Sequence, residues 1–305
     1  MMQLHKKFMH VHQTLFALLL VSGVARAEEA KLTIALYVPN APFESGEARY
    51  NFVSKVAQAV TAAGVPAEPK AFAKASDFEA AIKKNAVDFA IVDGVYLAER
   101  GVPWQVFASA TSGGETSARW GLFSSEAGGI VEMQGKKLAL PSTGGKDTQF
   151  IENALLDGEL PKHFGARQST PDIASAVQAV TLKKAECVFA PDSLARSLRK
   201  VYDAGKVPNP AFVQIRTTLT ADVVTKVRAA VAGTSGGAVY DSWRVSSADA
   251  YRSLSGRLGV RTRRAIMAEP EVVNLAEDSS IVVPLTVEPL LPDVRDQFWT
   301  PTGAP

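Results

Sequence analysis

Residues 77–99 read DFEAAIKKNAVDFAIVDGVYLAE and predict a helix, a buried strand and a second helix in direct succession. The first helix is expected over Asp77–Asn85, with Ser76 as its cap. The apolar run Val87–Val92 reads as a buried strand that ends at Asp93, and a helix over 95–99 follows. Strands that alternate with amphipathic helices are the signature of an α/β fold.

The same alternation continues on both sides of this stretch. Strands are expected at 31–38, 67–73, 87–92, 105–110, 119–124, 135–140, 187–190 and 212–217, and helices at 48–63, 77–85, 95–99, 148–156, 174–184, 192–200 and 221–232. After Gly237 the pattern weakens, and 246–305 reads as an extension with a basic run near Arg261 and an extended, proline-punctuated end. If this extension is an appendage, its deletion should leave the rest of the fold intact.

The first 27 residues predict a cleaved secretory signal peptide. Lys6 and Lys7 precede the apolar run Leu15–Val21, and Ala25-Arg26-Ala27 offers a cleavage site. The apolar run is shorter than the roughly 20 residues that a permanent membrane span requires. We therefore expect a mature chain that starts near Glu28 and works in the periplasm.

Charge and composition exclude several classes of function. The chain has 33 Lys and Arg against 31 Asp and Glu, and removal of the signal segment leaves 30 against 31, which gives no reason to expect nucleic acid as a partner. Only His163 and Cys187 remain of the residues that zinc prefers, so we expect no metal site, no cofactor and no enzyme activity. His163 reads as a residue of an exposed turn, and Cys187 as a buried apolar one.

The loop after the strand at 135–140 carries the most suggestive chemistry. There Ser142, Thr143 and Gly144 stand between the strand and the start of a helix. Helix N-termini present unpaired N–H groups and attract anions, and hydroxyls add further donors. The spacing does not match a P-loop, because Leu140 and Asp147 stand where glycine and Ser or Thr are required. A capped turn without a ligand is the alternative.

Other strand ends are predicted to reach the same cleft. Asn40, Phe43, Glu44 and Arg49 follow the first strand, Asp93–Tyr96 follow another, and Asp192 and Ser193 follow a third. Ligands of open α/β sheets bind outside the carboxyl ends of the strands. Each residue also has a structural interpretation: Tyr96 as packing, Asp192 as a helix cap and Arg49 as a solvent-facing side chain.

The order of these pieces resembles the periplasmic solute-binding proteins of ABC transporters, type 2 arrangement, and among them the phosphate/phosphonate-binding family. Residues 78–90 resemble the family's helix and its "x-G-x-V-D-x-A" strand, with Asn85 or Ala86 where glycine is usual. Residues 93–96 occupy the place of a Gly-Pro-x-x-Tyr turn, and 135–140 are similar to an "L-x-G-K-x-V-A" strand. Residues 184–190 stand where the family has "G-E-V-D-A-G", followed by a matching Asp-Ser pair.

This resemblance implies a two-lobed fold that closes on a ligand. Lobe 1 would comprise 31–107 plus 216–240 and lobe 2 would comprise 118–208, with crossovers near 108–117 and 209–216. The resemblance assigns ligand contacts to Tyr96, Ser142, Thr143 and Asp192. Gly144 joins these candidates because a glycine in the loop lets an oxyanion approach the backbone.

Together these inferences predict a monomeric, secreted protein that captures a small anionic solute, phosphate- or phosphonate-like, and delivers it to a membrane permease. A ligand sensor, or a degenerate binding protein that docks on a membrane partner, is the alternative.

Overall fold

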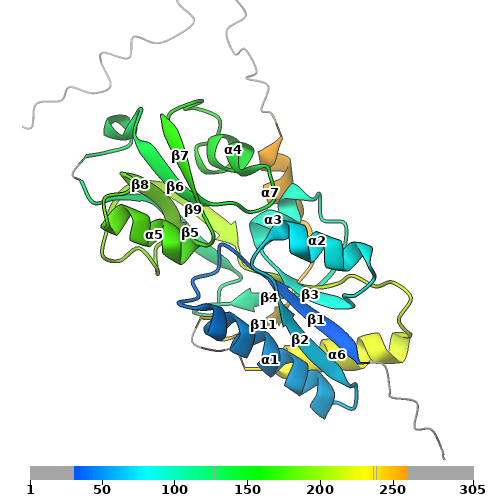
Figure 1. The fold of residues 1–305 in the computed structure, drawn as a ribbon. Helices are drawn as coiled ribbons and strands as arrows, with labels where there is room; N and C mark the ends of the chain where they lie inside the picture. Colours follow the sequence, from blue (N-terminus) through cyan, green and yellow to red (C-terminus); the bar gives the residue numbers. More distant parts are fainter. Residues whose placement is uncertain (1–30, 127, 236, 238, 260–305) are drawn as a thin grey trace, which may run out of the picture. The chain divides into compact units, whose positions relative to one another are not determined.

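The computed structural model describes residues 31–126, 128–235, 237 and 239–259. The predicted signal peptide and residues 260–305 of the predicted extension lie outside this range. The described residues form two α/β lobes, each built on its own sheet (Figure 1). No helix among them is both long and apolar enough to span a membrane.

The first lobe contains a six-stranded sheet in the order β11-β4-β10-β3-β1-β2. Strands β1, β2 and β3 run parallel, whereas β10, β4 and β11 continue the sheet in antiparallel pairs. The strands are β1 (Leu32–Tyr37), β2 (Ala67–Ala71), β3 (Phe89–Val92), β4 (Gln105–Thr111), β10 (Ala211–Gln214) and β11 (Ser242–Val245). The helices are α1 (Gly46–Ala62), α2 (Ala75–Lys83), α3 (Gly94–Glu99) and α6 (Ala221–Gly233).

The helices of this lobe cover both faces of the sheet. One face packs against α1 and α6 through an apolar cluster that includes Phe52, Val56 and Phe212. The other face packs against α2 and α3 through Tyr37, Phe78 and further residues. This two-sided burial explains why β1 and β3 are apolar along most of their length.

The second lobe contains a five-stranded sheet in the order β7-β6-β8-β5-β9. Its strands are β5 (Ser117–Ser124), β6 (Lys137–Pro141), β7 (Ala166–Thr170), β8 (Cys187–Pro191) and β9 (Arg199–Pro208). Its helical segments are a 3-10 turn (Val131–Met133), α4 (Asp147–Gln149), which continues as a π-helix (Phe150–Leu155), and α5 (Ile173–Thr181). Cys187 is fully buried, which confirms its prediction as an apolar core residue.

The chain passes between the sheets at two short segments, 112–116 and 209–210. Strand β4 of the first sheet ends at Thr111, and the chain returns to this sheet at Ala211, where β10 begins. The two connecting segments are therefore shorter than the crossovers expected from the sequence. Asn209 joins them, because its side-chain amide donates to the Ala110 and Glu115 carbonyl oxygens, at 3.0 Å each.

Helix α7 (Asp249–Leu258), the last among the described residues, packs against both lobes. Tyr251 is buried with the first lobe, whereas Leu254 and Leu258 join the core of the second. The prediction that residues 246–305 form an extension was therefore wrong for 246–259, because these residues belong to the same compact unit as the two lobes.

Other local predictions were also wrong. Residues 192–198 form turns rather than a helix, and Arg199 and Lys200 already belong to β9, where they pair with β5. Helix α2 begins before Ser76, which therefore does not cap it. His163 is only 8% exposed, and a ring nitrogen lies 2.7 Å from the Ile130 carbonyl oxygen, so it is not a residue of an exposed turn. Asn85, which stands near the family's glycine, adopts a φ of 54°, a left-handed conformation that asparagine tolerates better than most residues.

Candidate functional site

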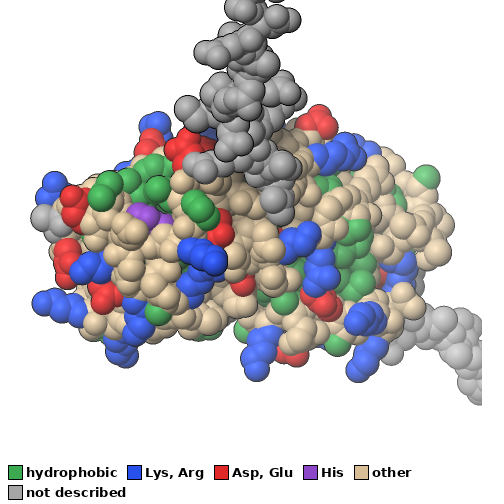
Figure 2. All heavy atoms as spheres, turned by 90° about the horizontal axis from the view of Figure 1, so that it is seen from above, with side chains coloured by type: hydrophobic (Ala, Val, Ile, Leu, Met, Phe, Trp, Pro, Cys, Tyr) green, Lys and Arg blue, Asp and Glu red, His purple; other side chains and the backbone are tan. Residues whose placement is uncertain are grey.

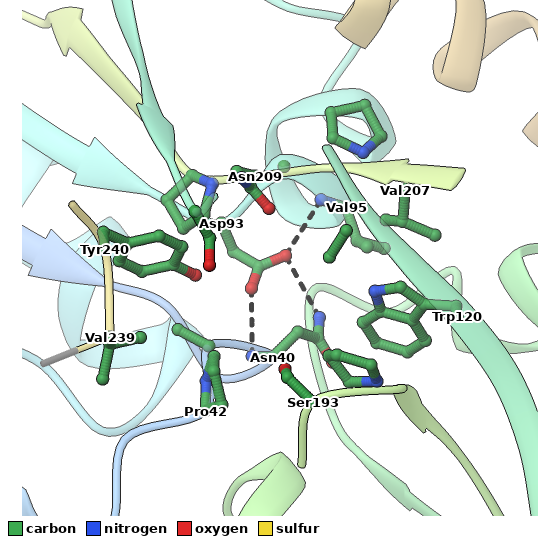
Figure 3. Close-up of a pocket in the computed structure, with 17 residues that line it drawn as sticks. Asn40, Pro42, Asp93, Val95, Trp120, Ser193, Val207, Asn209, Val239 and Tyr240 are labelled. Carbon is green, nitrogen blue, oxygen red and sulfur yellow. Dashed lines mark hydrogen bonds between the residues drawn. The ribbon is translucent and has the colours of Figure 1, made fainter. Parts of the chain in front are cut away.

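A small cavity that is partly open to solvent lies between the two lobes, beside the crossovers (Figure 3). Loops after β1, β3, β4 and β8 reach it, together with β5 and the segment between β9 and β10. The residues that line it are Asn40, Ala41, Pro42, Asp93, Gly94, Val95, Ser112, Ala118, Trp120, Pro191, Ser193, Val207, Pro208, Asn209, Pro210, Val239 and Tyr240. Residues of both lobes therefore enclose one space at the carboxyl ends of several strands.

Asp93 and Asn40 form the polar centre of this cavity. Asp93 Oδ1 accepts hydrogen bonds from the Val95 amide at 2.9 Å and from Asn40 Nδ2 at 3.1 Å, and Oδ2 accepts from the Asn40 amide at 3.0 Å (Figure 3). Burial raises the pKa of Asp93, and the hydrogen bonds from Asn40 oppose that effect. The loops after β1 and β3 are thus held together by one buried carboxyl group.

Two aromatic side chains complete the walls. Trp120 from β5 and Tyr240, just before β11, are 3% and 4% exposed and lie on opposite sides of the cavity in the view of Figure 3. No described residue forms a hydrogen bond with the indole N–H of Trp120 or with the hydroxyl of Tyr240. Sequence reasoning missed both residues, because an aromatic residue in or beside a strand most often indicates core packing.

Three of the predicted ligand contacts, Tyr96, Thr143 and Gly144, come together where the lobes touch. Thr143 Oγ1 accepts from Asn40 Nδ2 at 3.1 Å, and its carbonyl oxygen accepts from the Tyr37 hydroxyl at 2.5 Å. Gly144 lies so close to Tyr96 that a Cβ there would be 3.0 Å from the tyrosine Cδ2. These three residues form contacts between the lobes and do not line the cavity itself.

The other two predicted contacts, Ser142 and Asp192, lie elsewhere. The hydroxyl of Ser142 is exposed and 3.5 Å from Asp147 Oδ2. Asp192 forms an ion pair with Lys200 at 2.9 Å, while its neighbour Ser193 lines the cavity. The predicted convergence of strand ends therefore brings Asn40, Asp93 and Ser193 to one site. The assignment of the five predicted residues to a ligand stays a prediction.

The N-termini of α3 and α5 are capped by the chain's own carboxylates, and a third carboxylate binds an amide in the loop before α4. Asp93 accepts from the first amides of α3, and Asp147 accepts from the Thr143 amide at 2.9 Å. Asp172 accepts from the Ser175 amide of α5 at 2.8 Å and also binds Arg49 of the first lobe at 2.5 Å. In the loop that the sequence offered as an anion site, the Thr143 amide thus already has an anionic partner.

Several solved structures share this fold, although their sequences differ strongly from that of this chain. No family model matches the chain, and no curated protein matches it. PhnD1 from Prochlorococcus marinus (MIT 9301), in complex with methylphosphonate, aligns with a TM-score of 0.60 at 9% identity over 74% of this chain and 96% of its own. A binding protein component of an ABC phosphonate transporter from Pseudomonas aeruginosa aligns with a TM-score of 0.58 at 13% identity, over 74% and 87%. XAC2383 from Xanthomonas citri, bound to ATP, aligns with a TM-score of 0.56 at 12% identity, over 74% and 96%.

The chain has the type 2 periplasmic binding protein fold. In this fold a ligand lies between the lobes, which is where the cavity of Figure 3 is found. The predicted α/β class with two lobes is confirmed.

Within this periplasmic binding protein fold, Glu99 is an unusual buried acid at the contact between the lobes. It is 4% exposed at the end of α3 and accepts no well-formed hydrogen bond from the described residues. Burial and, to a smaller extent, the charge of Asp147 raise its pKa to about 8, while the Lys146 amide and ammonium act in the opposite direction. The acid is therefore mostly protonated at neutral pH.

We expect Glu99→Gln to stabilise the protein above pH 8. The folded state holds the Glu99 proton more tightly than the unfolded chain, so ionisation costs stability as the pH rises from about 4.5 towards 8. The variant should exceed the parent free energy of unfolding by about 3 kcal/mol at pH 9 and match it at pH 4. Urea unfolding at pH 4, 6 and 9 measures this difference. Glu115→Gln, at a carboxylate that is 63% exposed, is the control, and an equal gain there would contradict the prediction.

Proposed function

We propose that this protein captures a small solute between its two lobes, outside the cytoplasmic membrane, and delivers it to an ABC permease. The observation that carries the proposal is the cavity that strand-end loops of both lobes enclose beside the two crossovers. Neighbours of the same fold that bind methylphosphonate or serve an ABC phosphonate transporter support it. The signal-peptide pattern of residues 1–27 supports a periplasmic location.

The proposal requires that ligand binding changes how far the lobes are separated. Dyes on Gln58→Cys in α1 and Gln178→Cys in α5 report this separation by energy transfer, because the two exposed positions lie in different lobes. The native Cys187 should not take up dye, since it is buried and burial raises the pKa of its thiol to about 12. Mass spectrometry of the small molecules that the purified protein releases on denaturation identifies the ligand. If such molecules are absent, and if periplasmic extract leaves the energy transfer unchanged, the proposal fails.

A phosphate- or phosphonate-like anion is the ligand that the sequence resemblance implies, and we keep it as one candidate. Its support is the methylphosphonate complex of a neighbour with the same fold. Such an anion must displace Asp147 in order to bind the Thr143 amide of the loop at 142–145. Asp147→Asn should therefore tighten methylphosphonate binding at least about tenfold, because it removes a like charge from the site. Calorimetric titration of the two proteins tests this, and equal or weaker affinity in the variant speaks against an anion at this loop.

A further inference from the structure

The cavity between the lobes has an unusual balance of charge. None of its 17 lining residues is Lys, Arg or His, and Asp93 is the one charged residue among them. On the face of the molecule shown in Figure 2, by contrast, basic and acidic side chains are interspersed. The cavity therefore differs in character from that face of the molecule, and this difference bears on the ligand of the proposed function.

Several donors that could hold an anion are already used. The amides at the starts of α3 and α5 and in the loop before α4 bind Asp93, Asp172 and Asp147. Arg49, which reaches across the lobes, is paired with Asp172. An anion in the cavity would face the Asp93 carboxyl group without a compensating positive charge, which is costly in a buried place.

One acceptor of the cavity-lining residues, in contrast, is unpaired, whereas both Asp93 oxygens already accept hydrogen bonds and contribute through their charge. Asn40 is 6% exposed, and its Oδ1 has no hydrogen-bond partner among the described residues. The orientation of this amide is determined by its other end, because Nδ2 donates to both Asp93 and Thr143 Oγ1. The spare oxygen is therefore a buried acceptor of a cavity-lining residue that still lacks a hydrogen-bond partner.

Aromatic rings provide the remaining walls. Trp120 and Tyr240 flank the cavity, and the Tyr240 hydroxyl end points towards Asp93 (Figure 3). Aromatic faces attract ammonium groups through the ring quadrupole, most strongly where water is excluded. A carboxylate, a spare carbonyl oxygen and two aromatic rings match the chemistry of an alkylated ammonium ion.

We propose that the cavity binds a small organic cation, a primary or quaternary ammonium compound, with Asp93 as the counter-charge and Trp120 and Tyr240 as the walls. This inference rests on the proposed function and names the class of solute. It requires no rearrangement of the capping carboxylates.

A ligand pair that differs only in charge tests the inference directly. Choline and its neutral isostere 3,3-dimethyl-1-butanol have nearly the same shape, and methylphosphonate supplies the opposite charge. Calorimetric titration of the purified protein should give choline an affinity at least about tenfold above that of the isostere, with no measurable binding of methylphosphonate. Equal binding of the isostere, preferential binding of methylphosphonate, or no binding of choline and of methylammonium would each overturn the inference.

A charge placed at the mouth of the cavity gives a second readout. Ser193 is exposed, lines the cavity and forms no side-chain hydrogen bond with another described residue, so substitutions there should not disturb folding. Ser193→Lys should weaken choline binding at least about tenfold through charge repulsion, whereas Ser193→Gln, of similar length, should weaken it far less. Gln58→Lys, on the exposed side of α1, adds the same charge away from the cavity and should leave the affinity unchanged. Equal losses in the two Ser193 variants would contradict the charge argument.

Failure of this inference is distinguishable from failure of the proposed function. If methylphosphonate or another anion binds and changes the separation of the lobes, the protein is a solute-binding protein and only the ligand class is wrong. If no released small molecule is found and no extract changes the energy transfer, both ideas fail together.

Discussion

A chain that ends at Val245 should not fold stably, whereas a chain that ends at Gly259 should keep the folded structure. The difference is α7, which buries Tyr251 in the first lobe and Leu254 and Leu258 in the second. Burial of three such side chains stabilises by about 5 kcal/mol, which is comparable to the whole stability of many domains. Circular dichroism and urea unfolding of the two truncated proteins measure the effect. A folded chain that ends at Val245 would show that α7 is an appendage after all.

Hydrogen bonds explain why this helix is important for the crossovers as well as for the cores. The Tyr251 hydroxyl lies 2.6 Å from Ser109 Oγ and donates to the Asn209 carbonyl oxygen at 3.0 Å. In the second lobe, Asn153 Nδ2 donates to the Leu258 carbonyl oxygen at 3.1 Å. Helix α7 therefore contacts both lobes and is also hydrogen-bonded to Asn209, in one of the two segments that join the lobes.

Single substitutions separate these contributions. Leu254→Ala should lower the free energy of unfolding by about 3 kcal/mol, because the buried site cannot fully collapse around the lost atoms. Ser253→Ala, at an exposed position of the same helix, should change it by less than about 0.5 kcal/mol. Comparable losses in both variants would contradict the assignment of this loss to packing between the lobes, because alanine is a better helix former than either residue it replaces.

The second large effect is expected from Gly94→Ala, at the first residue of α3. A Cβ at Gly94 would clash with the Pro208 carbonyl oxygen and lie 3.2 Å from that of Asn209, and both groups belong to backbone that cannot rotate away. We expect a loss of about 3 kcal/mol in the free energy of unfolding, because the crossover must move to relieve the overlap. Pro208 and Asn209 also line the cavity, so ligand affinity should fall with stability. Thermal unfolding and titration of the captured ligand measure the two effects.

Gly46→Ala is the matched control, since Gly46 also begins a helix but a Cβ added there would meet no described atom within 4 Å. Alanine favours helix over glycine by up to about 1 kcal/mol, so this variant should be neutral or slightly more stable. If Gly94→Ala behaves in the same way, the close approach of the crossover to α3 is not essential.

Most of the helices and strands could be predicted from the sequence, and the failures have local causes. Leu194 and Leu198 are spaced like residues on one side of a helix, and both pack against the core of the second lobe. Pairing with β5 overrides that spacing, and Arg199–Pro208 becomes a strand whose residues are mostly half-exposed. A strand with such a weak apolar pattern cannot be recognised before its partner is known.

The candidate site could be predicted only in part. Asn40, Asp93 and Ser193 follow strands that the sequence reveals, so their convergence is a consequence of α/β topology. Trp120, Asn209 and Tyr240 could not be assigned in this way. They approach the cavity from a strand, a crossover and a segment before β11, and nothing near them in the sequence distinguishes such a position from core packing.

The sequence by itself determined the α/β class, the order of most helices and strands, and the strand ends that meet at the cleft, because periodic burial of apolar residues is a local property. Only the tertiary structure decided which groups remain available to a ligand. Asp93, Asp147 and Asp172 each satisfy nearby amides, while Asn40 Oδ1 is left without a partner among the described residues, and this depends on contacts between residues as far apart as Asn40 and Thr143. The polarity of the cavity follows from those long-range contacts, since a donor that is already paired inside the protein no longer selects a ligand.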